Sequence, residues 1–103
     1  MKVIAEFTII PIGVGVSVSE YVAVCERILA KAGLTVQLHA NGTNIEGDWD
    51  TVFAAIRQCH EAIHSRGAPR IHTSISVSTR TDREQTMADK VRSVESKLRA
   101  SGE

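Results

Sequence analysis

The segment from Leu34 to Asp50 constrains the fold most, because it combines a hairpin signal with the start of a helix. Asn41 and Gly42 stand between two short runs in which apolar and polar residues alternate. Asn-Gly is favoured in two-residue hairpin turns, because both central residues of the common turn need a positive φ. The sequence therefore predicts strands 34–39 and 43–47 joined through an Asn41-Gly42 turn.

Two further strands are predicted from the alternation of apolar and polar residues. They cover residues 3–10, where Pro11 is expected to end the pairing, and residues 70–79. The same alternation predicts that one face of the sheet is apolar and covered by helices. That face carries Val3, Phe7, Val36, Leu38, Ile45, Ile71 and Ile75.

Two helices are predicted from apolar residues at helical spacing and from residue types that begin or end helices. The first covers about residues 17–32, with a capping box from Ser17 to Glu20 and Gly33 as its left-handed end. The second is expected to begin after Asp48, a good N-cap, and to stop at Gly67.

A third helix is predicted after a charged turn, with Asp82 as its cap. Its apolar stripe needs a partner surface beyond the two helices of the basic motif, so it is expected either to pack on a sheet edge or to contact another subunit. The stripe consists of Met87, Val91, Val94 and Leu98.

The predicted order of elements is βαββαβ followed by one more helix, in a chain whose 103 residues suffice for a single domain, 1–103. This order is typical of the ferredoxin-like α+β sandwich. Right-handed crossovers give the spatial strand order 4-1-3-2, counted along the chain. The fold class predicted is therefore a ferredoxin-like βαββαβ sandwich with an additional C-terminal helix.

The uncovered face of this sheet is unusually polar, and it places Glu6 and Glu46 on adjacent central strands. One interpretation is a simple solvated face of an antiparallel sheet. Another is a face that subunits cover, where a carboxylate removed from water costs several kcal/mol unless a cation or a donor is supplied. A small positively charged molecule would suit that environment.

Composition argues against several classes of function. Twelve basic residues balance twelve acidic ones, so no overall field attracts nucleic acid or anionic lipid. No signal peptide and no apolar run long enough to cross a membrane are recognised. Cys25 and Cys59 form no CxxC motif and lie in amphipathic helical patterns, which favours buried reduced thiols in a cytoplasmic protein.

Catalytic and metal-binding signals are weak. His60 and His64 have the spacing of a two-histidine metal face, but nothing completes a ligand set, and a surface or half-buried pair is favoured. Ser, His and Asp are present without a nucleophile elbow. The sequence predicts no catalytic residue, no metal site and no cofactor.

The chain resembles the small thiamine-binding proteins of ferredoxin-like fold. The likeness covers nearly the whole chain, and its most specific segment is Gly42–Asp50, with the sequence GTNIEGDWD. Further matching segments are Pro11–Gly13, Ser17–Ala23, Cys59–Ala62 and Met87–Glu95. The chain departs from the family at Asn41, where methionine is common, and at 78–82, where an Asp-Asp-Arg-Arg run is common.

The resemblance implies a homo-oligomer, usually a tetramer of paired dimers, that binds thiamine or its hydroxymethylpyrimidine part without chemical turnover. Thiamine carries a thiazolium cation and an aminopyrimidine, so its site needs a carboxylate, hydrogen-bonding side chains and some apolar or aromatic surface. The expected ligand-binding residues are Glu6, Thr8, Gln37, Asn44, Glu46, Trp49 and Ser74. Trp49 could equally anchor the packing of its helix.

Two other functions remain open from the sequence. One is an oligomeric regulatory or interaction module with no small-molecule ligand. The other is an enzyme in which His39 or His72 beside Glu6 or Glu46 acts as an acid–base pair. The non-catalytic binding protein is the expectation that the residues favour.

Overall fold

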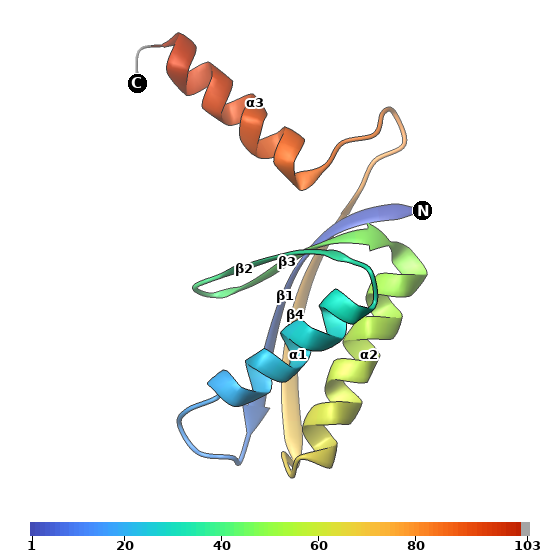
Figure 1. Cartoon of the computed structure of the whole chain (residues 1–103), viewed down its shortest axis with the longest axis vertical. Coiled ribbons are helices and arrows are strands. Elements are labelled where there is room, and N and C mark those ends of the chain that lie inside the picture. The colour runs from blue at the N-terminus through green and yellow to red at the C-terminus, as the bar shows by residue number, and fades with distance from the viewer. Residues whose placement is uncertain (102–103) are drawn as a thin grey trace.

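The structure, a computed structural model, describes residues 1–101 (Figure 1). A strand opens the chain, and a helix, a hairpin, a second helix, a further strand and a final helix follow. Their bounds are β1 (Lys2–Ile12), α1 (Ser19–Lys31), β2 (Thr35–His39), β3 (Gly42–Asp48), α2 (Trp49–Ser65), β4 (Arg70–Thr79) and α3 (Met87–Ala100).

The strands form one sheet in the order β2-β3-β1-β4, and all neighbouring strands are antiparallel. Helices α1 and α2 lie side by side on one face, whereas α3 projects away from them (Figure 1). This is the predicted ferredoxin-like α+β sandwich with a C-terminal helix, and the predicted strand order is confirmed.

The core lies between the sheet and helices α1 and α2. Alternate residues of β1, from Val3 to Ile9, are buried against it, as the alternation predicts. Leu29 of α1 and Ile45 of β3 expose none of their surface. Helix α2 contributes Val52, Ala55, Ile56, Cys59 and Ile63.

The turn of the β2–β3 hairpin differs from the prediction. Residues 40–41 form the loop and Gly42 already belongs to β3, opposite His39. Gly42 has no positive φ, so the Asn41-Gly42 turn is wrong. Glycine is needed there for space, because a Cβ atom would lie 2.8 Å from Thr8 Oγ1 and 3.1 Å from the Phe7 carbonyl oxygen.

Two predicted helix caps are also wrong. Val18, without a side-chain hydrogen bond, precedes α1, so Ser17 does not cap it. Helix α3 is capped by Thr86 in a capping box with Asp89, because the side chain of Asp82 binds Arg80 instead. The predicted cap of α2 is confirmed: Asp48 accepts a hydrogen bond from the amide of residue 50.

The covered face is less complete than predicted at its margins. Leu38 exposes 59% of its surface and Ile75 exposes 37%, and they lie on β2 and β4, the two edge strands of the sheet. Pro11 does not end β1, since it pairs with Ile71 of β4. Beyond Phe7 the strand has lost β3 as a neighbour, and proline is tolerated in a strand where one side is open.

Candidate functional site

The polar face of the sheet assembles as the alternation predicts. Glu6 of β1 lies opposite Asn44 of β3 on one side and Ser76 of β4 on the other. On β2, Gln37 continues this row because it pairs with Asn44. The Asn44 amide donates a hydrogen bond of 3.4 Å to Gln37 Oε1. The row therefore offers a carboxylate and two amides side by side.

A hollow of about 270 Å³ lies between this row and the start of α3, and we call it the sheet-face hollow. Glu6, Gln37 and Asn44 are the three predicted site residues that it brings together. The remaining lining residues are Ile4, Ala5, Ser76, Ser78, Met87, Lys90 and Val91. The hollow thus combines hydrogen-bonding groups with an apolar wall.

Glu46 lies next to this hollow but is covered by α3. Glu46 exposes only 6% of its surface, and its Oε1 lies 3.6 Å from Lys2 Nζ. The backbone N–H of Met87, the first residue of α3, points to Glu46 Oε2 at 3.5 Å. A carboxylate at a helix N-terminus is favourable, because unpaired N–H groups and the helix dipole face it. Glu46 therefore holds α3 over the sheet.

The other predicted site residues lie elsewhere. Thr8 donates a hydrogen bond of 3.1 Å to the Asn41 carbonyl, and Ser74 pairs with Thr8 across the sheet, beyond the sheet-face hollow. Trp49 begins α2, on the opposite layer. Its ring packs on Phe53 with 4.8 Å between ring centroids, as a packing anchor does.

Sequence reasoning missed the contribution of α3 to the hollow. Met87 and Val91 were predicted as a stripe, but no signal showed that the stripe begins over the polar face. Lys90 was missed for the same reason, because its place depends on the path of the 80–86 connection. The capping box from Thr86 to Asp89 was the one local signal for where α3 starts.

A larger, basic hollow of about 770 Å³ adjoins the sheet-face hollow and shares Ile4, Ser78 and Lys90 with it. Lys2, Arg80 and Arg83 also line this basic hollow. The guanidinium of Arg80 is occupied, since it donates to both carboxylate oxygens of Asp82. This contact lowers the pKa of Asp82 to about 2.

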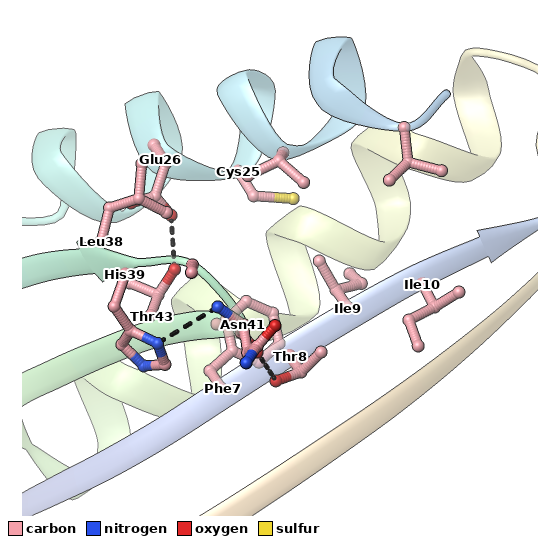
Figure 2. A pocket seen from close by; sticks show the side chains of 14 residues that line it. Phe7, Thr8, Ile9, Ile10, Cys25, Glu26, Leu38, His39, Asn41 and Thr43 are labelled. Atoms are coloured by element: carbon pink, nitrogen blue, oxygen red, sulfur yellow. Dashed lines mark hydrogen bonds between the residues drawn. The ribbon is translucent and has the colours of Figure 1, made fainter. Parts of the chain in front are cut away.

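A third hollow, of about 280 Å³, lies between α1 and the β2–β3 hairpin, and we call it the hairpin hollow (Figure 2). Thr43 Oγ1 donates a hydrogen bond of 3.0 Å to Glu26 Oε2 at its wall. Thr8 and Asn41 close one side through the hydrogen bond described above. It shares no lining residue with the sheet-face hollow.

The two histidines of α2 each contact a protein oxygen atom. His60 Nε2 lies 2.6 Å from Thr73 Oγ1, and His64 Nδ1 lies 2.8 Å from the Ala68 carbonyl oxygen. Burial, and then the charge of His64, lower the pKa of His60. Across residues 1–101, no group of three His, Cys, Asp or Glu side chains is placed to hold a metal ion.

The two cysteines are free and buried, as predicted. The Cys59 thiol points to the Cys25 carbonyl oxygen at 3.9 Å. The interaction of this thiol with the Cys25 side chain, and then burial, raise the pKa of Cys59 far above the usual range of a thiol. Among the described helices, none is long and apolar enough to span a membrane.

Known proteins are similar to this chain in both sequence and fold. A protein named UPF0045 protein sll0230, from Synechocystis, is 60% identical over 95% of this chain and 81% of its own length. The UPF0045 protein MJ1052 of Methanocaldococcus jannaschii is 37% identical over 99% of this chain and 94% of its own. Its crystal structure superposes with a TM-score of 0.85, covering 91% of this chain and 96% of that one.

A more distant structure carries a name related to thiamine. It is a protein of Thermotoga maritima whose name provisionally assigns it to thiamine biosynthesis or salvage. It matches with a TM-score of 0.78 over 91% of this chain and 99% of that one, and at 14% identity the likeness concerns the fold alone. The family model described as thiamine-binding protein matches residues 5–95. The chain therefore belongs to the thiamine-binding protein family.

Proposed function

We propose that this protein binds thiamine, or its hydroxymethylpyrimidine part, in the sheet-face hollow and does not transform it. The observation that carries the proposal is the convergence of Glu6, Gln37 and Asn44 on one hollow beside the apolar side chains of Met87 and Val91. Membership of the thiamine-binding protein family supports the choice of ligand.

The chemistry of the hollow suits the two rings of thiamine. Glu6 exposes 59% of its side chain and can balance a thiazolium cation or accept from the aminopyrimidine amino group. Asn44 and Gln37 each offer a donor and an acceptor for ring nitrogens. Met87 and Val91 supply apolar surface against which a flat ring can lie. Glu46 acts indirectly, since it holds α3 in place.

The proposal includes self-association through α3. Val91, Val94 and Leu98 are 52%, 59% and 45% exposed, and they continue the stripe that Met87 begins. A helix with one apolar face and few contacts to its own domain needs another surface to cover it. A second copy of the chain is the partner we propose, as a homodimer or homotetramer. It would also close the open side of the sheet-face hollow.

We further propose that the protein works in the cytoplasm. Its two cysteines are both free and buried, which suits a reducing compartment. Neither nucleic acid nor a membrane is proposed as a partner, because the twelve basic and twelve acidic residues balance.

A second candidate function rests on the same exposed stripe of α3. An oligomeric interaction module would use α3 as its contact surface and would need no small molecule. It predicts tight oligomers whose formation and stability are indifferent to thiamine.

Calorimetric titration with thiamine separates the two candidates. The binding protein should give saturable heat, and Glu6→Gln should weaken binding by on the order of 1.5–3 kcal/mol, because a charge-assisted contact is lost. Glu61→Gln is the matched control, since Glu61 lies on α2 and pairs only with Arg57 among the described residues. Absence of heat with both thiamine and hydroxymethylpyrimidine, from a protein that is folded and oligomeric, would favour the interaction module.

A further inference from the structure

The hairpin hollow is a second concave site, separate from the sheet-face hollow. It opens where the pairing of β1 with β3 ends, at Phe7 and Thr43, so that α1 and the hairpin loop face each other across the end of the sheet. In Figure 2, Cys25 and Glu26 point from α1 toward the strands, and Glu26 meets Thr43 of the hairpin. The hollow is therefore shaped by three elements of the domain itself, without any contribution from α3.

The walls of the hairpin hollow are mostly apolar. Phe7 and Ile9 form its floor from β1, and Val18 and Val22 line it from α1 and the residue before it. Leu38, which exposes 59% of its surface, stands at the margin of the hollow on β2. An exposed leucine beside a concave apolar surface gains contacts when an apolar group enters.

Glu26 is the single carboxylate among the lining residues, and no lysine or arginine of residues 1–101 lines the hollow with it. Its Oε2 accepts the hydrogen bond from Thr43, a residue only 4% exposed. Within the described residues, Oε1 has no hydrogen-bond partner and Glu26 belongs to no ion pair. The buried threonine thus fixes the carboxylate, and one oxygen stays available to a ligand.

Two neighbouring side chains of the hollow engage the backbone of Asn41. The Thr8 hydroxyl donates to the backbone carbonyl of Asn41, and the backbone N–H of Asn41 donates to His39 Nδ1 at 3.4 Å. These contacts hold the hairpin loop against β1, and Glu26 is the lining residue that supplies a carboxylate. A half-buried carboxylate in apolar surroundings favours a cation that can donate a hydrogen bond.

We propose that the hairpin hollow binds a compact organic cation, with an ammonium or amidinium group on Glu26 and an apolar body between α1 and Leu38. Its volume of about 280 Å³ lies near the lower end of small-molecule pockets, roughly 300–1,000 Å³, so the ligand is small. The site is distinct from the proposed thiamine site, because the two hollows have no lining residue in common. They adjoin at one contact, where His39 Nε2 of the hairpin hollow lies 3.8 Å from Glu6 Oε2 of the sheet-face hollow.

The test is an NMR titration of the ¹⁵N-labelled full chain with benzylamine, which is protonated at neutral pH and carries a compact apolar ring. Benzyl alcohol is the neutral analogue of the same size. The expected result is saturable movement of the amide signals of residues 22–26 and 41–43, with at least tenfold weaker binding of benzyl alcohol. Equal affinity for the two probes, absence of saturation, or movement centred on Asn44 and Val91 would overturn the proposal.

Two variants locate the contact. Glu26→Gln should weaken benzylamine binding at least tenfold and leave benzyl alcohol unaffected, because the amide keeps the size of the side chain and can still accept from Thr43. Glu20→Gln makes the same change at an exposed position of the same helix and should bind as the unmodified chain does. If Glu26→Gln fails to fold, Leu38→Ala removes an exposed wall residue and should weaken both probes. Unchanged binding of both probes to Leu38→Ala would contradict the site.

Discussion

Replacing Val94 with aspartate tests whether α3 is the contact between subunits. Val94 exposes 59% of its surface in the single chain and lies in the middle of the apolar stripe. Burying a whole valine side chain contributes about 1.5 kcal/mol, so covering its exposed part contributes about 0.9 kcal/mol. In a twofold contact both copies contribute, which gives about 1.8 kcal/mol.

Aspartate also brings a carboxylate into the contact, and removing that charge from water costs several kcal/mol unless it is paired. The two effects together raise the dissociation constant of the oligomer at least about 100-fold, since 1.4 kcal/mol corresponds to a factor of ten. Sedimentation velocity over a range of protein concentrations measures this change as a shift towards the monomer.

Ser93→Asp is the matched control. It adds the same charge to the same helix, but Ser93 lies off the stripe and its hydroxyl contacts Lys97. This variant should assemble as the unmodified chain does. An unchanged sedimentation profile for Val94→Asp, or an equal loss of assembly in both variants, would refute the proposed role of the stripe.

Three further predictions concern the stability of the fold. Leu29→Ala should lower the free energy of unfolding by about 2–5 kcal/mol, because this side chain is completely buried. Leu38→Ala should lower it by less than about 1 kcal/mol, because Leu38 is exposed. Equal losses in urea denaturation would contradict the assigned core. His60 has a lowered pKa in the folded chain, so the unfolded chain binds more protons. The contribution of His60 to the free energy of unfolding should therefore be fully present above the ordinary histidine pKa of about 6.5 and be lost as the pH decreases through the lowered value. Urea midpoints at several pH values should show a weaker dependence in His60→Gln, and an unaltered dependence would remove His60 as the cause. Thr86→Ala should destabilise the start of α3 by about 1 kcal/mol and speed its amide hydrogen exchange, while Thr86→Ser should not; equal exchange in both variants would argue against the capping box.

Sequence reasoning predicted the sheet well because period-two alternation carries most of the information about a sheet between helices and solvent. Residues 70–79 were placed as a strand with the bounds that the structure shows. The strand order also predicts the polar neighbours of Glu6, because the register of paired strands determines which side chains lie opposite each other. Gly33 and Gly67, with φ of +80° and +105°, mark the helix ends as predicted.

Local sequence motifs gave wrong predictions of a turn and of a helix cap, because tertiary contacts determine the structure at these positions. The Asn-Gly pair suggested a turn, but Gly42 is needed because β1 approaches its backbone closely. Asp82 resembled a cap, but its carboxylate binds Arg80, and Thr86 caps α3 instead. Short polar side chains fit caps, turns and ion pairs alike, so sequence alone does not choose among them.

The candidate site was predicted in part for a similar reason. Glu6, Gln37 and Asn44 share one sheet face, which alternation reveals. The part of the hollow that α3 supplies depends on the path of the connection after β4, and no periodicity encodes that path. The hairpin hollow was not predicted, because Glu26 lies on the covered side of the sheet, where the sequence pattern indicates only core residues.

The most direct test of the central claim is a crystal structure of the protein grown with saturating thiamine. The account predicts electron density for the aminopyrimidine between Glu6, Asn44 and Val91, with the open side of the hollow closed by a second copy of the chain. Thiamine bound elsewhere, for example against Glu26 in the hairpin hollow, or an empty sheet-face hollow in protein saturated with ligand, would contradict it.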